Sequence, residues 1–181
     1  MRVVGLLRGV NLGPTRKLHM ADLRAAVESL GHTDVETYLQ SGNVVFTPAD
    51  GVDADLGPAI ERAVEATAGI HSAVQIRTDR EMAAIVAANP YDRPDPTKVV
   101  VTFLASPKGP PDLDLAAFAP EGLTAHGREV YLDLPGGQAR SPLLKALGKA
   151  VPDDGVATSR NWRTVLALAE MSSAEPASRA R

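Results

Sequence analysis

The sequence predicts an α+β protein built from two ferredoxin-like halves of the βαββαβ type, each with an antiparallel sheet, followed by a C-terminal helix. Two observations lead to this fold class. Stretches typical of strands alternate with stretches whose apolar residues recur at helical spacing, and this order occurs twice along the chain. The chain also has 181 residues, of which 44% are hydrophobic, enough for a real core in one domain or two small ones.

The first half gives the clearest signals. Its predicted elements are a strand at 3–7, a helix at 20–30, strands at 35–39 and 44–46, a helix at 56–69 and a strand at 72–76. The run at 3–7 is continuously apolar, as in a buried strand. Gly31 and Gly69 provide stops for the two helices. Between the two alternating stretches, Gln40-Ser41-Gly42-Asn43 predicts a hairpin turn.

Residues 78–96 are predicted to connect the two halves. Thr78, followed by Glu81 three residues later, has the pattern of a capping box at the start of a helix. The Pro- and Asp-rich stretch that ends at Pro96 is the best subdomain boundary. We therefore expect a first half at 1–77, a second α+β half with the C-terminal helix at 97–171, and a disordered tail at 172–181.

The second half is predicted to repeat this organisation. Its elements are a strand at 99–104, a short helix at 113–118, strands at 123–125 and 130–134, a helix starting at Ser141-Pro142, a very short strand at 156–157 and a final helix. Thr158 or Ser159 is the expected N-cap of the final helix, which places Arg160 in its first turn. Trp162 lies in the apolar stripe of that helix, where a core position is favoured over a stacking platform.

Composition argues against several classes of function. The formal net charge of −3 disfavours nucleic-acid binding through a broad basic surface. There is no Cys, and the four His are dispersed without the spacing of metal ligands, so we expect neither a metal nor another cofactor. The N-terminal apolar run is too short for a signal peptide, and no run of 18 apolar residues occurs. We therefore expect a cytoplasmic protein without a membrane segment.

Polar residues gather in the loop at 8–17 and in the turn at 40–43. Because crossovers are right-handed, the second strand of a βαββαβ unit runs parallel to the first, and both segments lie at the same end of the sheet. The loop also leads into a helix whose free N–H groups favour an anion. Arg8 can form a bidentate contact, and Lys17 adds a mobile charge. We therefore predict a polar cleft that binds a small anionic or nucleotide-like ligand.

The predicted ligand-binding residues share charged or hydrogen-bonding side chains. They are Arg8, Asn11, Lys17, Gln40, Ser41, Asn43, Arg160 and Asn161. A positive charge in the first turn of a helix opposes the helix dipole, so Arg160 invites an anionic partner. That partner is either the ligand, with the C-terminal segment closing the cleft, or an internal carboxylate. Gly and Asn are also ordinary turn residues, so a purely structural role for the turn stays open.

Several motifs resemble the domain of unknown function 1697 (DUF1697) family of bacterial proteins. They are LLRGVNLG at 6–13, MADLR at 20–24, TYLQSGNVVF at 37–46 and TSRNWRTV at 158–165. The resemblance extends over residues 2–170 and implies a two-part α+β protein with ferredoxin-like halves. The activity of the family is unassigned, so the resemblance implies no catalytic residue.

Two alternatives to ligand binding stay open, as does the question of whether the protein is an enzyme. The first is a nucleic-acid-binding protein, although the two central strands contain only Phe46 of the aromatic residues with which ferredoxin-like sheets stack RNA bases. The second is a structural or interaction protein that acts as a homo-oligomer.

Overall fold

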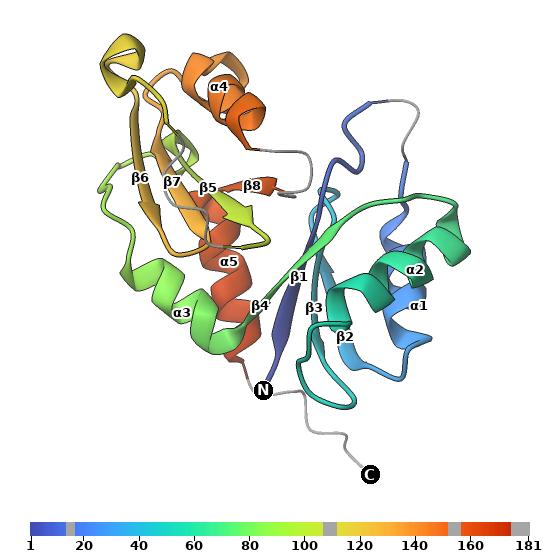
Figure 1. Ribbon diagram of the computed structural model, residues 1–181. Coiled ribbons are helices and arrows are strands. Elements are labelled where there is room, and N and C mark those ends of the chain that lie inside the picture. The colour runs from blue at the N-terminus through green and yellow to red at the C-terminus, as the bar shows by residue number, and fades with distance from the viewer. Residues whose placement is uncertain (14–16, 107–111, 152–156, 175–181) are drawn as a thin grey trace. The chain divides into compact units, whose positions relative to one another are not determined.

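A computed structural model describes residues 1–13, 17–106, 112–151 and 157–174 (Figure 1). The chain divides into two compact units, one formed by Met1–Ala83 with the residues from Leu168 onward, and the other by Ala84–Ala167. Each unit contains one four-stranded antiparallel sheet. The predicted α+β class with two ferredoxin-like halves is therefore confirmed, whereas the predicted limits of the halves stay predictions.

The first unit has the βαββαβ order expected from the sequence. Its elements are β1 (Val3–Leu7), α1 (Met20–Glu28), β2 (Thr33–Tyr38), β3 (Asn43–Thr47), α2 (Leu56–Ala68) and β4 (Val74–Thr78), followed by the start of α3 (Asp79–Ala87). The sheet order is β2-β3-β1-β4. Both helices pack on one face of this sheet, where Leu23 of α1 and Ile60 of α2 join a core with Phe46 of β3 (Figure 1).

Strand direction brings the end of β1 beside the β2–β3 turn, as predicted. Leu6 and Tyr38 both pair with Asn43, so β1 and β2 end at the same end of the sheet. The backbone N–H of Leu7 donates to the carbonyl of Gly42 at 2.8 Å. The loop that follows β1 is therefore anchored to the turn by a direct backbone hydrogen bond.

The second unit repeats the sheet order of the first. Its elements are η1 (Pro96–Lys98), β5 (Val99–Leu104), η2 (Leu115–Phe118), β6 (Gly122–His126), β7 (Glu129–Asp133), η3 (Gln138–Arg140), α4 (Pro142–Ala150) and β8 (Ala157–Asn161), followed by α5 (Trp162–Ser173). The order β6-β7-β5-β8 corresponds position by position to that of the first sheet. The short 3₁₀ helix η2 stands where the first unit has α1, so the predicted helix at 113–118 is a 3₁₀ turn.

Two predicted helix starts are confirmed by side-chain caps, those of α3 and α4. Glu81 accepts a hydrogen bond from the Thr78 N–H at 2.8 Å, and its own N–H donates to the Thr78 hydroxyl at 3.2 Å, which completes the predicted capping box. The Leu144 N–H donates to the Ser141 hydroxyl at 2.9 Å at the start of α4. Gly69 ends α2 in the left-handed conformation.

Several boundaries differ from those predicted, and three of them affect the candidate site or the C-terminal segment. The fourth strand runs over Val74–Thr78 rather than 72–76, and before it the Ser72 hydroxyl donates to the Arg8 carbonyl. The last strand of the second unit covers Ala157–Asn161, so the predicted position of Arg160 in a helix is wrong. Helix α5 continues to Ser173 and thus includes the start of the predicted tail, while residues 175–181 lie outside the described part.

In the part of the chain that the structure describes, no helix has the length and apolar character needed to cross a membrane.

Candidate functional site

The predicted site lies in the first unit, at the end of the sheet where β1 leads into its loop. Asn11 ties this loop to the turn, since its amide Nδ2 donates to the Gln40 carbonyl at 2.6 Å and to the Leu18 carbonyl at 3.0 Å. Its Oδ1 accepts a hydrogen bond from the Leu18 N–H at 2.8 Å. Asn11 has a positive φ of 57°, a conformation that Asn tolerates. These bonds give the Asn11 side chain a structural role.

Ser41 and Asn43 lie inside the turn itself. Asn43 is fully buried, and its Nδ2 donates to the Tyr38 carbonyl at 2.8 Å and to the Ser41 hydroxyl at 2.9 Å. A buried amide without partners would be costly, and these bonds satisfy its donors. The structure thus supports the structural alternative for these two side chains, and their contact with a ligand stays a prediction.

Arg8, Lys17 and Gln40 differ from the residues around them. All three are exposed, and their side chains have no hydrogen bond or ion pair within the described residues. The backbone of Arg8 is nevertheless fixed on both sides of its Cα. Its N–H donates to the Ala73 carbonyl at 2.9 Å, and its carbonyl accepts from the buried Ser72 hydroxyl at 2.9 Å. A well-anchored backbone therefore presents an unpaired guanidinium to solvent.

Two leucines beside these residues were not predicted as part of the site. Leu12 is 84% exposed, and Leu39 is 56% exposed with a positive φ of 56°. Because Leu39 continues the alternating pattern of the preceding strand, the sequence predicted it as a strand residue, which is wrong: β2 ends at Tyr38. No sequence signal distinguishes an exposed turn leucine from the last apolar residue of a strand.

The predicted residues of the C-terminal segment lie in the second unit. Arg160 belongs to β8 and is 7% exposed, with its Nη1 donating to the Thr158 hydroxyl at 2.7 Å and to the Ser159 carbonyl at 2.9 Å. Burial lowers the pKa of Arg160 to about 10, so the guanidinium stays charged at neutral pH. Asn161, rather than Thr158 or Ser159, caps α5, with its Oδ1 accepting from the Thr164 N–H at 2.9 Å.

Arg160 lies in β8 and therefore does not face the dipole of a helix from its first turn. Its position in a strand removes the reason for expecting an anionic partner at a helix start. Trp162, predicted as a core residue, is only half-buried at the beginning of α5. A contribution of this segment to the ligand site stays a prediction.

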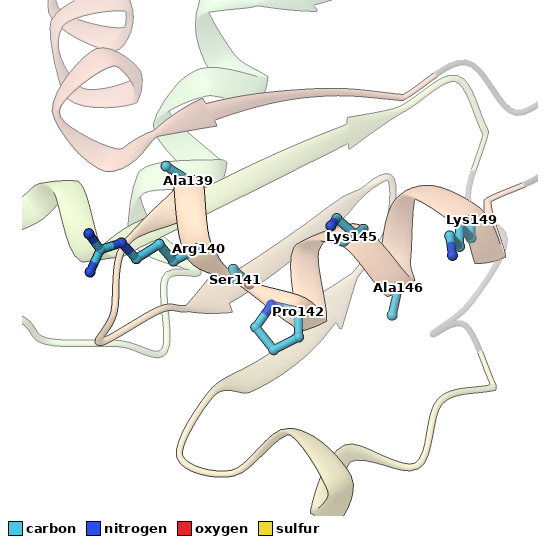
Figure 2. Close-up of a pocket in the computed structure, with 7 residues that line it drawn as sticks. All are labelled: Ala139, Arg140, Ser141, Pro142, Lys145, Ala146 and Lys149. Carbon is cyan, nitrogen blue, oxygen red and sulfur yellow. The ribbon is translucent and has the colours of Figure 1, made fainter.

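A second basic feature lies on α4 in the second unit. A hollow of about 340 Å³ has Arg140, Lys145 and Lys149 in its lining, and no acidic residue among the described residues that line it (Figure 2). Arg140 extends away from Lys149, so the three charges do not converge on one point (Figure 2). The first turn of α4 already has an internal anion, since the Leu143 N–H donates to the Glu121 carboxylate at 3.0 Å. The hollow is thus an alternative but less organised place for an anion.

The described histidines form no metal site, and His32 has a structural role. No group of three His, Asp or Glu side chains in the described ranges could hold a metal ion. His32 stacks on Phe46 with 4.9 Å between ring centroids, and its Nδ1 accepts a hydrogen bond from the Ala49 N–H at 3.2 Å. Burial lowers the pKa of His32 below its usual 6.5, and the nearby Asp50 partly opposes this shift. The hydrogen bond from Ala49 requires an unprotonated Nδ1.

The lowered pKa of His32 predicts a loss of stability in acid. The unfolded chain takes up this proton more readily than the native protein, so stability is full above pH 6.5 and falls as the pH drops through the lower native pKa. We expect the melting temperature of the wild type to fall more between pH 8 and pH 5 than that of His32→Phe, which keeps the stacking but cannot be protonated. His126→Phe, a change at an exposed position, is the control, and its melting temperature should fall between pH 8 and pH 5 as much as that of the wild type. An equal fall for the wild type and His32→Phe would contradict the prediction.

The fold and the site define a two-unit α+β protein with a polar, cation-bearing loop at the end of its first sheet. A family model described as a protein of unknown function (DUF1697) matches residues 1–131. The chain therefore belongs to the DUF1697 family, as its motifs suggested. No match was found among the curated proteins.

A solved structure shares the fold. The conserved bacterial protein SP0830 from Streptococcus pneumoniae is 24% identical and has a TM-score of 0.72, with 94% of this chain and 98% of that chain covered. The similarity supports the arrangement of the elements and carries no information about a ligand.

Proposed function

We propose that the protein binds a small anionic ligand at the end of the first sheet, with Arg8 as the main contact and Lys17 and Gln40 beside it. The observation that carries this proposal is the fixed backbone of Arg8 together with an exposed guanidinium that has no partner within the described residues. A guanidinium presents a planar fork of donors that matches phosphate and carboxylate oxygens. The molecule as a whole is acidic, so this cation does not belong to a generally basic surface.

The surroundings of Arg8 favour a preorganised site. The bonds of Asn11 and Asn43 hold the loop and the turn in place without using the side chains of Arg8, Lys17 or Gln40. A site is effective when its contact residues are supported by a fixed shell of this kind. The first turn of α1 adds little to this site, since the Asp22 N–H already donates to the His19 carbonyl at 3.0 Å and the Asp22 carboxylate opposes a second anion there.

The two alternatives receive less support. Recognition of RNA by a ferredoxin-like sheet requires an accessible face, but all five residues of β1 are buried. No feature of the described residues favours a homo-oligomer over a monomer, and light scattering of the purified protein tests it directly.

The proposal predicts that Arg8→Gln abolishes most of the binding of inorganic pyrophosphate. A hydrogen bond to a charged group contributes about 1.5–3 kcal/mol, so affinity should fall about tenfold or more. Isothermal titration calorimetry of the full chain at low ionic strength measures this loss, because salt screens exposed charges.

Two variants with the same change in charge serve as controls. Arg80→Gln removes an exposed cation at the opposite end of the same sheet. Arg80 comes just after Thr78, which pairs with Val3 at the start of β1, whereas the site lies beyond Leu7 at the other end, where Leu7 pairs with Val74. Its affinity should equal that of the wild type. Lys145→Gln tests the hollow on α4. If Lys145→Gln weakens binding and Arg8→Gln does not, the anion binds in the second unit and the proposal is wrong.

A further inference from the structure

Two exposed leucines adjoin the proposed anion site. Leu12 follows Asn11 in the sequence, and Leu39 precedes Gln40. A hydrogen bond from the Asn11 side chain to the Gln40 carbonyl joins the two segments. Leu12, at 84%, has the highest exposure of the large hydrophobic residues in the described part of the chain. Isolated exposed leucines are common, but these two lie on segments that a hydrogen bond joins, in the same loop and turn as Arg8 and Lys17, whose side chains have no partner within the described residues.

The backbone at Leu39 strengthens this observation. Its φ of 56° lies in the left-handed region, where a side chain with a Cβ is strained and where Gly or Asn is preferred. Asn11 has the same conformation, but its side chain makes three hydrogen bonds there. Leu39 has no compensating burial, since more than half of its surface is exposed. Strain without a folding benefit is typical of positions that serve binding.

We infer that the ligand is an organic anion that carries an apolar group, such as a phosphate monoester. This inference rests on the proposed function and extends it. Arg8 binds the charged head, and the apolar group lies on Leu12 and Leu39. Charge complementarity selects an anion, and the exposed leucines supply the contact that inorganic phosphate cannot use.

The test compares two ligands of the same charge. Methyl phosphate and phenyl phosphate differ only in their apolar group, so the ratio of their affinities measures the apolar contact alone. For the wild type we expect phenyl phosphate to bind about tenfold more tightly, which corresponds to about 1.4 kcal/mol of apolar burial. In Leu39→Asn and Leu12→Gln the ratio should fall toward one, with the affinity for methyl phosphate unchanged.

The Leu39→Asn variant carries a second readout. Because Asn tolerates a positive φ, this change should raise the melting temperature by about 2–4 °C while it weakens phenyl phosphate binding. A residue with only a structural role would not move the two readouts in opposite directions. Val52→Asn, at a 40% exposed position in the loop after β3, is the matched control and should leave the affinity ratio unchanged.

The outcomes separate this inference from the proposed function. If Arg8→Gln weakens both ligands but Leu39→Asn leaves their ratio unchanged, the anion site stands and the apolar contact is wrong. If Arg8→Gln leaves the affinities for both ligands unchanged, the proposed function itself is wrong. If the Leu12 and Leu39 variants instead abolish self-association, or binding to anionic lipid vesicles, these leucines serve another partner and the inference is overturned.

Discussion

Gly42→Ala is expected to destabilise the first unit by about 3 kcal/mol, from about 1–2 kcal/mol of left-handed strain and about 1–3 kcal/mol of overpacking. Gly42 has a φ of 72°, and a Cβ there would stand 2.5 Å from Val10 Cγ2 and 2.8 Å from Leu7 Cβ. Leu7 Cβ is attached to a strand backbone and cannot move aside. Because the loop and the turn touch at this glycine, the change should also separate Arg8 from Gln40 and weaken anion binding.

A second positive-φ glycine isolates the cost of the clash. Gly69 has a φ of 66° with nothing within 4 Å of an added Cβ, so Gly69→Ala should cost only the strain of about 1–2 kcal/mol. Urea unfolding of both variants gives the difference. Equal losses for Gly42→Ala and Gly69→Ala would mean that the turn and the loop do not pack as closely as the structure shows.

The adjacency of the loop and the turn could be predicted because it depends on topology alone. Once a βαββαβ order is recognised, right-handed crossovers place the end of β1 beside the β2–β3 turn, whatever the side chains are. Which side chains of the site are bonded internally and which are exposed to a ligand could not be predicted in this way. Asn11 and Gln40 have similar amide side chains, and only the atomic positions show that Asn11 is bonded internally whereas Gln40 is exposed.

The error at Arg160 has a different cause. Thr158-Ser159 followed by apolar residues at helical spacing fits an N-cap, but the same residues also fit a short strand beside β5. Pairing decides between them, since Val101 pairs with Arg160 and Phe103 with Thr158. Such tertiary pairing overrides a local capping signal, and Asn161 then takes over the cap. Only the strand pairing shows that the cap lies at Asn161.

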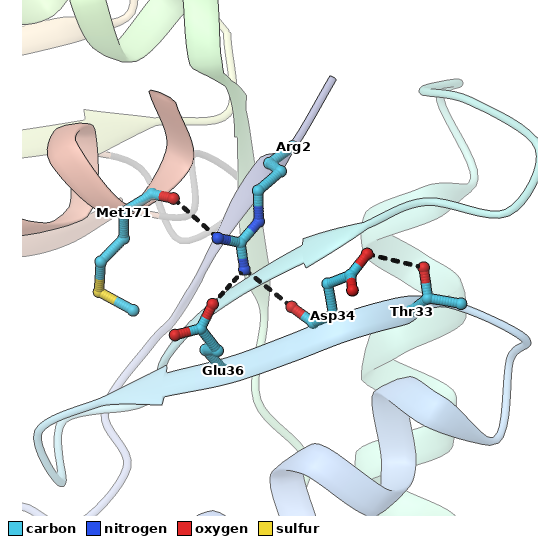
Figure 3. A network of polar contacts seen from close by, with 5 residues as sticks. All are labelled: Arg2, Thr33, Asp34, Glu36 and Met171. Atoms are coloured by element: carbon cyan, nitrogen blue, oxygen red, sulfur yellow. Dashed lines mark hydrogen bonds and ion pairs between the residues drawn. The ribbon is translucent and has the colours of Figure 1, made fainter. Parts of the chain in front are cut away.

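Arg2 organises a polar network that sequence patterns did not reveal. Only 4% exposed, it donates from Nη1 to the Met171 carbonyl at 2.9 Å and from Nη2 to the Asp34 carbonyl at 2.8 Å and to Glu36 at 2.6 Å (Figure 3). The register of β2 shifts between Thr33 and Glu36, and Asp34 has a positive φ of 53° at this irregularity. The guanidinium thus binds the irregular part of β2 and one of the last carbonyls of α5, where a cation is favourable.

Arg2→Met is therefore expected to destabilise the protein by about 3 kcal/mol, since two charge-assisted hydrogen bonds to carbonyls, at about 1.5 kcal/mol each, are lost together. Methionine keeps the apolar stem, so the loss reports mainly the removal of the buried guanidinium and its contacts. Denaturant unfolding measures the change in free energy. The ion pair itself should contribute little, because the Glu36 side chain is 57% exposed.

Glu36→Gln separates the carbonyl contacts of Arg2 from its ion pair. It keeps an acceptor for the guanidinium and removes only the charge, so it should cost less than about 1 kcal/mol. A loss as large as that of Arg2→Met would assign the stabilisation to the ion pair. In that case the loss of unfolding free energy should shrink at high ionic strength, because salt screens an exposed ion pair. Hydrogen bonds from a buried guanidinium to carbonyls are not screened in this way. Repeating both measurements in 1 M salt therefore decides whether the carbonyl contacts of Arg2 or its ion pair provides the stabilisation.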